Sequence, residues 1–197
     1  LVCAGDTQSL MVNPKDRAMQ VIAGDAGTAT IVEKGEDIIP FYFKTIGSKY
    51  TDLIIPAGGY RLPCSVETAQ EETDDAGNIR SKNDLFMDGM DVMNFALTEV
   101  PNAVHEILSF DNIEKDNIDL FAMHQPNKLI LDHLAIDLEI ASEKMPVGLQ
   151  KTGNTASASI PLLFSVLKEQ GKDFSNMKRV LCCGFGMGVS ISSAIVN

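Results

Sequence analysis

The chain has 197 residues, of which 45% are hydrophobic and 22% are charged. This composition supplies a core for one large domain or two small ones and excludes disorder for most of the chain. With 27 acidic and 16 basic residues the formal net charge is −11, which argues against a protein that binds nucleic acid by neutralising phosphates. The four cysteines include an adjacent pair and no CxxC spacing, so we expect reduced, mostly buried thiols and neither a zinc site nor a disulfide framework.

No apolar run reaches the roughly 18 to 20 residues of a membrane-spanning helix, and the amino end does not resemble a signal peptide. We therefore expect a cytoplasmic protein without a membrane partner. The chain opens without an initiator Met, on an apolar run that already has the character of a strand. This opening predicts a piece of a longer protein.

Short apolar or β-branched runs separated by glycine predict strands in the first quarter of the chain. The predicted strands are residues 1–4, 28–32 and 38–46. Between residues 64 and 84 apolar residues become scarce and acidic residues frequent. That composition predicts a solvated excursion, with a binding role for its charges as the weaker alternative.

Apolar residues at helical spacing predict a helix over residues 92–108, with Asp88 or Asp91 as its N-cap. Pro101 interrupts this pattern, so we expect a kink or two abutting helices. The rest of the chain alternates between strands and helices, which indicates an α/β layered sheet. The predicted elements are a buried strand at 118–123, helices at 128–138 and 157–168, and strands at 180–183 and 189–196.

A weak internal repeat is visible in the two ends of the chain. Residues 1–5 (LVCAG) resemble residues 180–184 (VLCCG), and residues 30–33 resemble residues 194–197. Each copy is a strand that ends in glycine and is followed by a second strand. The repeat predicts a duplicated fold in which the beginning of the first copy is absent, although two matches this short also arise by chance.

His124 lies where a predicted buried strand ends and a helix begins, the place where ligands gather in open α/β sheets. A histidine there can serve as a general base or an electrostatic donor, and Asn127 can cap the next helix or face the cleft. The alternative is a structural histidine beside a capping asparagine.

A run of small residues, 153–161, opens the next predicted helix. Small side chains let a backbone approach a ligand closely, and Asn154 offers an amide donor that does not ionise. The alternative for Asn154 is a polar N-cap on a helix packed against the sheet. Residues 184–188 read GxGxG, but neither the helix nor the acidic residue of a dinucleotide-binding loop follows, so we interpret them as a tight turn between strands.

The other histidines and the cysteines show no catalytic pattern. His105 and His133 lie within predicted helices without metal-ligand spacing, so no metal site is expected. Cys3, Cys182 and Cys183 lie inside predicted strands, where burial makes thiols unreactive.

Taken in order, these motifs resemble β-ketoacyl-acyl-carrier-protein synthase III along essentially the whole chain. The matching segments are 24–27 (GDAG), 87–89 (MDG), the helix around Phe95, 119–127 (DLFAMHQPN), 153–161 (GNTASASIP) and 184–188 (GFGMG). The resemblance implies a partial thiolase-like layered α/β fold. It places closing strands of the first half in residues 1–46, a connecting excursion and helices in 47–110, and the second half in 111–197.

The family uses a Cys-His-Asn triad, and the resemblance assigns its histidine to His124 and its asparagine to Asn154. It implies transfer of an acyl group from acyl-CoA to the cysteine, followed by condensation with the carbanion that decarboxylation of malonyl-acyl-carrier protein generates. Both donors would stabilise the same enolate oxygen, so we expect their side chains to converge on one cleft. The substrate-binding residues that the resemblance implies are Asn127, Phe185 and Gly186.

The resemblance places the nucleophilic cysteine upstream of Leu1. We therefore expect this chain to be inactive alone and to require the missing amino-terminal half. The implied partners are acyl-CoA, as substrate, and acyl carrier protein. A homodimer is implied for the intact protein. We expect no cofactor and no nucleic-acid or membrane partner.

The chain departs from the family at the start of the helix after His124. Pro126 replaces a common alanine, and Leu129-Ile130 replace an arginine, which leaves Lys128 as the nearest cation. A lysine offers a point charge and no guanidinium fork, so the resemblance does not extend to carrier-protein docking through that arginine. Met187 also interrupts a glycine-rich turn, which would reshape the acyl pocket.

Two alternatives stay open. One is another CoA-dependent enzyme of the thiolase superfamily, and the other is a non-catalytic split half that serves as an interaction subunit. Retention of His124 and Asn154 at the family's spacing argues against the second.

Overall fold

The computed structural model describes residues 1–35, 38–110 and 112–197. The α-helices are α1 (Arg17–Gln20), α2 (Gly89–Phe110), α3 (Lys128–Asp137) and α4 (Ser159–Glu169), the last preceded by a 3₁₀ turn, η4 (Ala156–Ala158). The strands are β1 (Val2–Thr7), β2 (Asp25–Thr30), β3 (Phe41–Thr45), β4 (Leu53–Ile54), β5 (Glu72–Thr73), β6 (Ile79–Arg80), β7 (Phe86–Met87), β8 (Leu120–Met123), β9 (Val180–Gly186) and β10 (Ser190–Val196).

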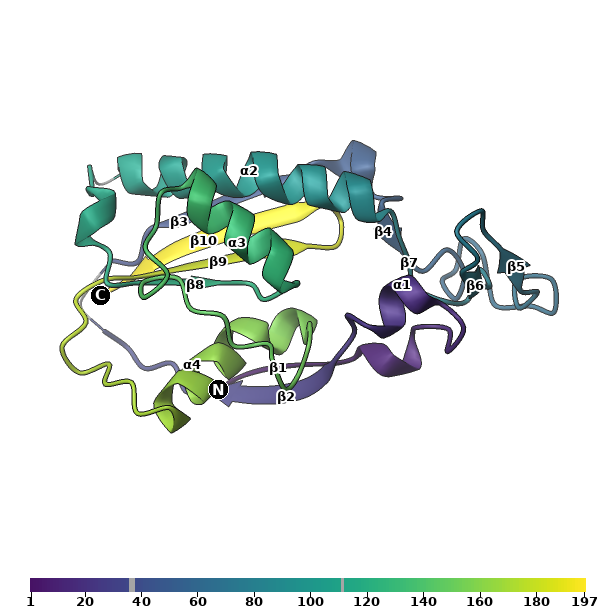
Figure 1. The fold of residues 1–197 in the computed structure, drawn as a ribbon, viewed down its shortest axis with the longest axis horizontal. Helices are drawn as coiled ribbons and strands as arrows, with labels where there is room; N and C mark the ends of the chain where they lie inside the picture. The colour runs from purple at the N-terminus through teal and green to yellow at the C-terminus, as the bar shows by residue number, and fades with distance from the viewer. Residues whose placement is uncertain (36–37, 111) are drawn as a thin grey trace.

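The main sheet has four strands in the order β3-β10-β9-β8 (Figure 1). Strands β8 and β9 run parallel, whereas β10 is antiparallel to both β9 and β3. Residues 187–189 join β9 to β10, with Ser190 paired to Gly186. Gly188 has a φ of 106°, which a residue with a Cβ rarely adopts. The tight turn predicted for the GxGxG segment is confirmed.

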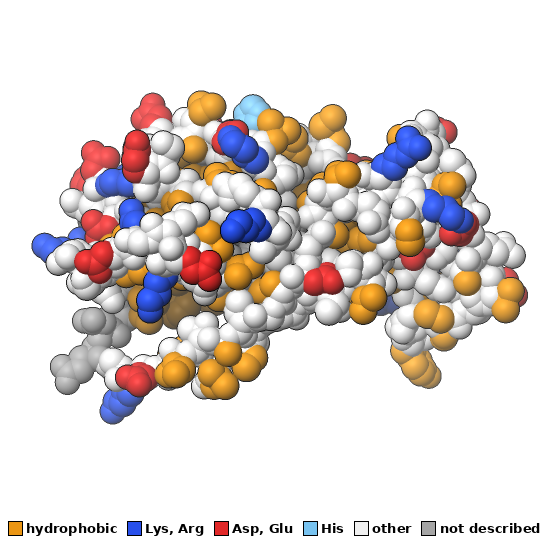
Figure 2. Space-filling model, turned by 60° about the horizontal axis from the view of Figure 1, so that its bottom comes forward, with side chains coloured by type: hydrophobic (Ala, Val, Ile, Leu, Met, Phe, Trp, Pro, Cys, Tyr) orange, Lys and Arg blue, Asp and Glu red, His pale blue; other side chains and the backbone are white. Residues whose placement is uncertain are grey.

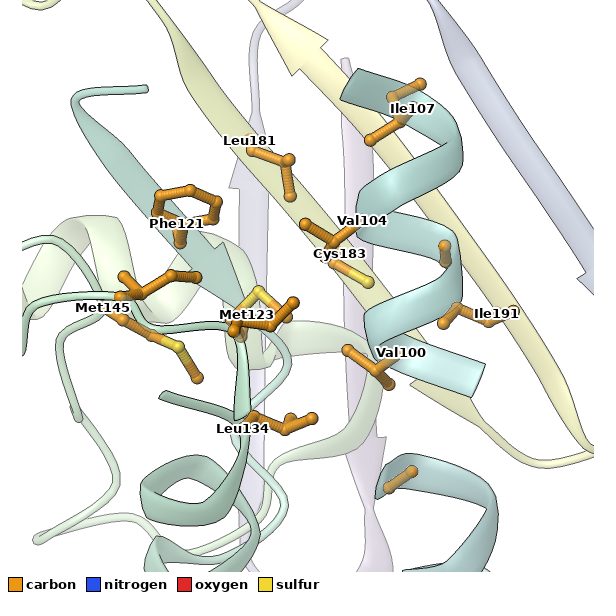
Figure 3. Close-up of a cluster of buried hydrophobic side chains, with 14 of the residues drawn as sticks. Val100, Val104, Ile107, Phe121, Met123, Leu134, Met145, Leu181, Cys183 and Ile191 are labelled. Atoms are coloured by element: carbon orange, nitrogen blue, oxygen red, sulfur yellow. The ribbon is translucent and has the colours of Figure 1, made fainter. Parts of the chain in front are cut away.

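The main sheet is covered on both faces at β8, whereas β3 at the opposite edge is largely exposed. All four residues of β8 are buried, and successive side chains point to opposite faces. Phe121 and Met123 pack in the cluster formed with α2 and α3 (Figure 3). Leu120 and Ala122 pack in a second cluster with α4 on the opposite face. A strand buried on both faces has a continuous apolar sequence, which is the pattern of residues 120–123 within the predicted strand 118–123.

Helix α2 begins at Gly89, three residues before the predicted range of 92–108, directly after one of the two predicted N-caps. The Asp88 carboxylate accepts the backbone N–H groups of Met90 and Asp91, so Asp88 and not Asp91 is the N-cap. The helix then runs without a break through Pro101, and the expectation of two abutting helices is wrong.

Packing explains why Pro101 does not end the helix. A proline inside a helix costs about 3 kcal/mol. Burial of one large aliphatic side chain contributes about 1.5 to 3 kcal/mol, and α2 buries several such side chains on both sides of the proline. Val100, Val104 and Ile107 lie against Leu181 and Ile191 of the sheet (Figure 3).

Strands β1 and β2 form a separate two-stranded ribbon, and α4 lies between this ribbon and the main sheet (Figure 1). The Asp6 carboxylate of β1 accepts the backbone N–H and the hydroxyl of Ser157, which ties the ribbon to η4. Much of the ribbon is open to solvent, and Cys3 is exposed, so the expectation that its thiol is buried is wrong. Figure 2 shows hydrophobic side chains scattered over the face of the molecule that it presents.

The ribbon repeats the hairpin formed by β9 and β10. Cys3 pairs with Ala29 in one and Cys182 with Ala194 in the other, and the six pairs of β1–β2 correspond one for one to pairs of β9–β10. This register equates Ala29 with Ala194, whereas the sequence repeat had equated Thr30 with Ala194. The second match is therefore displaced by one residue.

Residues 47–88 form an arm that carries the short pairs β4–β7 and β5–β6 (Figure 1). Most of residues 64–84 are exposed, which confirms the predicted solvated excursion. Within the arm the Asp74 carboxylate accepts hydrogen bonds from Asn78 and pairs with Arg80. The Arg80 Nε also lies 3.0 Å from the buried carboxylate of Asp16, which joins the arm to the start of α1. No helix in the described segments is both long and apolar enough to span a membrane.

Candidate active site

A cavity of about 860 Å³ lies between the main sheet, the start of α4 and the segments around the β1–β2 ribbon. One part of its wall is apolar and consists mainly of Met11, Met19, Ile22, Leu53, Ile55, Leu85 and Met87. Another part is polar and contains His124, Asn154 and Ser159. A largely apolar cavity with a few convergent polar groups is the usual form of a small-molecule site.

His124 follows β8 directly and lies at the carboxyl end of that strand. Its backbone N–H donates to the Cys183 carbonyl at 2.8 Å, which extends the parallel ladder between β8 and β9 by one bond. The imidazole Nδ1 lies 2.7 Å from the Ser159 hydroxyl, and the Phe185 ring meets the imidazole at 87° with centroids 5.1 Å apart. Backbone, hydroxyl and aromatic contacts therefore fix both the position and the plane of the ring.

Burial keeps His124 uncharged. The residue is 8% exposed, and desolvation lowers its pKa from 6.5 to about 4. The ring is consequently neutral throughout the physiological range. A neutral imidazole can donate a hydrogen bond from one nitrogen while it accepts at the other.

The residues after His124 hold the loop and start the next helix. The Gln125 amide donates to the Met123 carbonyl and accepts from the Gly148 N–H, so this buried side chain ties the loop to the segment that follows α3. The Asn127 side chain accepts from the Ile130 N–H at 2.9 Å and is the N-cap of α3. Asn127 is not among the residues that line the cavity, so its role as a substrate-binding residue stays a prediction.

Asn154 presents a free amide donor to the cavity. Its Oδ1 accepts the Ala156 N–H at 2.9 Å, an interaction that assigns the carbonyl and amine ends of the side chain. Among the described residues the Nδ2 amine makes no hydrogen bond, so it is available to a ligand. The backbone is held at both ends, because Asn154 N–H donates to the Ile22 carbonyl and its carbonyl accepts from Gly24.

Two glycines permit the close crossing that holds Asn154. A Cβ on Gly24 would lie 1.8 Å from the Thr152 carbonyl oxygen, and a Cβ on Gly153 would lie 2.7 Å from the Ile22 carbonyl oxygen. Gly153 also has a φ of 66°. The GDAG and GNT motifs are thus parts of one structure. The segment that precedes β2 holds the backbone of Asn154, which precedes α4.

The other predicted residues divide between the cavity and the surface. Phe185, Gly186 and Met187 line the cavity. Lys128 forms an exposed ion pair with Asp132 one turn later on α3. His105 and His133 are exposed helix residues, and the described residues contain no group of three or more potential metal ligands.

The buried thiols are poor nucleophiles. Desolvation raises the pKa of Cys182 to about 11 and that of Cys183 to about 12. Cys3 and Cys64 are exposed, and no cysteine is among the described residues that line the cavity.

Residues 1–47 match the family model for 3-oxoacyl-[acyl-carrier-protein] synthase III, and residues 108–197 match the model for the C-terminal part of the same synthase. The β-ketoacyl-[acyl-carrier-protein] synthase III of Streptococcus gordonii is 32% identical over 100% of this chain and 58% of its own length. A putative 3-oxoacyl-[acyl-carrier-protein] synthase 3 of Campylobacter jejuni is 31% identical over 100% of this chain and 55% of its own length.

Solved structures of this synthase are similar to the chain over nearly its whole length. A 3-oxoacyl-(acyl-carrier-protein) synthase III superposes with a TM-score of 0.93 and 37% identity, over 99% of this chain and 59% of its own. The 3-oxoacyl-(acyl-carrier-protein) synthase of Burkholderia xenovorans superposes with a TM-score of 0.83 and 36% identity, over 98% of this chain and 54% of its own. The chain belongs to the 3-oxoacyl-acyl-carrier-protein synthase III family. It spans rather more than half the length of the relatives that it matches.

The membership confirms the predicted thiolase-like layered α/β fold. In this synthase III chain the sequence pattern does not indicate the site role of Ser159 or of most of the apolar wall. Ser159 was only one of several small residues in the run before α4, and its proximity to His124 depends on how α4 packs against β8. The wall draws Met11, Met19 and Leu85 from segments far apart in sequence, so no local pattern could have identified it.

Proposed function

We propose that this chain supplies two of the three catalytic groups of a decarboxylative condensing enzyme that joins acyl-CoA to malonyl-acyl-carrier protein. The observation that carries the proposal is the placement of His124 and Asn154 on one cavity, each with a neutral side chain. Neutral donors suit this chemistry because they stabilise a developing oxyanion without first having to lose or gain a proton.

In the proposed reaction the carbon–carbon bond to the malonyl carboxylate breaks and carbon dioxide leaves. The electron pair of that bond moves into the thioester, where it generates an enolate oxygen. The Nδ2 amine of Asn154 and the cavity-facing nitrogen of His124 donate hydrogen bonds to this oxygen. The enolate carbon then attacks the acyl thioester, the new carbon–carbon bond forms, and the thiolate departs.

The thiol that carries the acyl group is proposed to come from outside these 197 residues. No cysteine lines the described cavity, and Cys182 and Cys183 have pKa values far above neutrality. A reactive cysteine needs the opposite environment, with a lowered pKa and access to substrate. The 197-residue chain alone should therefore form no acyl-enzyme when incubated with radiolabelled acetyl-CoA, and stoichiometric acetylation of Cys3, Cys182 or Cys183 would contradict this.

The proposed donors are tested by His124→Ala and Asn154→Ala in the protein at its natural length. Removal of one oxyanion donor typically costs about 100- to 1000-fold in rate. Decarboxylation of malonyl-acyl-carrier protein should fall by this factor in each variant, whereas acylation by acyl-CoA should fall less. His133→Ala, an exposed histidine of α3, is the control. Decarboxylation at the wild-type rate in either variant would contradict the proposal.

We also propose the organisation into closing strands of a first half in residues 1–46, a connecting part in 47–110 and a second half in 111–197. The matching registers of β1–β2 and β9–β10 support it, because each hairpin would close one copy of a duplicated unit. Limited proteolysis tests these boundaries, with the exposed arm at 47–88 as the expected site of first cleavage. First cleavage within 111–197 would contradict them.

A further inference from the structure

We propose that Ser159 is a positioning residue that fixes the tautomer of His124, so that Nδ1 is the acceptor and Nε2 carries the proton that faces the cavity. This inference rests on the proposed function of His124 for its catalytic consequence, but the tautomer itself is measured independently.

The contact between the two residues is close and buried. The Ser159 Oγ lies 2.7 Å from His124 Nδ1, and the two residues are 4% and 8% exposed. Ser159 is the first residue of α4, which packs against β8 through Leu163 and its neighbours. The hydroxyl therefore has a rigid support, and its approach to Nδ1 is set by the packing of a helix on a strand.

The direction of the hydrogen bond follows from what each partner can still do. Within the described chain the Ser159 hydroxyl makes no other hydrogen bond, in contrast to Ser165 of the same helix, whose hydroxyl donates to the Pro161 carbonyl. If Nδ1 carried the proton, the buried Ser159 hydrogen would have no acceptor, and buried donors without acceptors are disfavoured. If Ser159 donates to Nδ1, both groups are satisfied and the proton of the neutral ring is on Nε2.

The resulting tautomer suits an oxyanion site. A neutral ring has one N–H group, and only the Nε2–H tautomer leaves a donor free, because Nδ1 is engaged with Ser159. The opposite tautomer would place a lone pair where negative charge develops. Ser159 thus acts on the reaction through His124 without contacting the reacting atoms.

The direct test is ¹⁵N NMR of the protein at its natural length, with the histidine rings labelled. Protonated and unprotonated ring nitrogens have distinct shifts, and His124→Gln identifies the His124 signals by their loss. We expect a protonated Nε2 and an unprotonated Nδ1 at neutral pH. A protonated Nδ1 with an unprotonated Nε2 in the wild-type protein would overturn the proposal, whether or not any variant folds.

Variants of Ser159 then distinguish a role in positioning His124 from a contribution to the stability of the fold. In Ser159→Ala the two tautomers should become mixed, and kcat for malonyl decarboxylation should fall about tenfold while KM stays within twofold of wild type. Ser159→Thr keeps a hydroxyl and should retain the Nε2–H signal, and Ser165→Ala is the matched control on the same helix. An unchanged tautomer and an unchanged kcat in Ser159→Ala would overturn the proposal.

The two proposals fail in different ways. If the tautomer shifts in Ser159→Ala but His124→Ala decarboxylates at the wild-type rate, the proposed function of His124 is wrong and the role of Ser159 as a determinant of the tautomer stands. If His124→Ala is inactive and Ser159→Ala keeps both tautomer and rate, the role of Ser159 is wrong and the proposed function stands.

Discussion

The β1–β2 and β9–β10 hairpins have the same strand register and opposite environments. Strand β9 pairs with β8 along its second edge and lies under α2, so Leu181 is fully buried. The equivalent residue of β1, Val2, is 56% exposed, and β1 pairs only with β2 among the described strands. The two strand pairs therefore share a register although different elements surround them, so burial depends on which elements cover a pair and not on the pairing itself.

The largest expected difference between the hairpins is in stability. Leu181→Ala should lower the free energy of unfolding by about 2 to 5 kcal/mol, because it leaves a cavity beneath α2. Val2→Ala, at the equivalent position of β1, should change it by less than about 0.5 kcal/mol. Urea denaturation of both variants measures the two values. Equal effects would show that β1 is as well packed as β9.

The two hairpins also differ in a buried titratable group, because His124 follows β8, the strand that pairs with β9. The pKa of His124 is about 4 in the folded protein and 6.5 in the unfolded chain. Between these two pH values the unfolded chain therefore binds more protons than the folded protein. Stability should accordingly fall as the pH is lowered from about 6.5 to about 4, by about 3 kcal/mol in total.

His124→Gln provides the control for this pH dependence. The difference in unfolding free energy between wild type and His124→Gln, measured in urea at a series of pH values, isolates the histidine from the carboxylates. A difference that does not vary between pH 6.5 and pH 4 would show that His124 titrates normally in the folded protein.

Cys3 and Cys182 occupy equivalent positions in the two hairpins, and we expect their thiols to differ in reactivity. Cys182 has a pKa raised to about 11, so about one thiol in a thousand is ionised at pH 8, and Cys183 is ionised still less. Cys3, at the equivalent position of β1, is exposed. Iodoacetamide at pH 8, followed by peptide mass mapping, should modify Cys3 and the exposed Cys64 at least tenfold faster than the adjacent pair. Modification of Cys183 at the rate of Cys3 would contradict the burial of β9.

The smallest expected effect concerns the helix that covers β9 and β10. Asp88→Ala removes the N-cap of α2 and should lower stability by about 1 kcal/mol. Asp91→Ala, three residues later in an exposed pair with Lys49, should cost less than about 0.5 kcal/mol. Thermal unfolding of the two variants tests the assignment of the cap. A larger loss in Asp91→Ala would contradict it.

Local chemistry explains why much of the fold was predictable. Helix α3 begins after Asn127 because an asparagine side chain accepts the first free N–H groups, and β8 is recognisable because burial on two faces requires a continuous apolar run. The turn at Gly188 requires a conformation that other residues avoid. Each of these signals acts within a few residues, so the sequence alone suffices to locate it.

The ordered motifs also predicted the family and the two catalytic candidates, His124 and Asn154, which share the cavity. The site's support could not be predicted, because Ser159 reaches Nδ1 through the packing of α4 on β8, and Asn154 is held by the segment around Gly24.

By itself the sequence determined the strands β8, β9 and β10, the start of α3 and the order of motifs, because these depend on side-chain patterns and caps within one element. The tertiary structure alone decided that α2 continues through Pro101, that Cys3 is exposed while Cys183 is buried, and that Ala29 is the counterpart of Ala194. Those outcomes depend on contacts between residues far apart in the chain. Packing free energy outweighs the local preference of a proline, and it differs between two strands at equivalent places of a repeated pair when only one of them is covered.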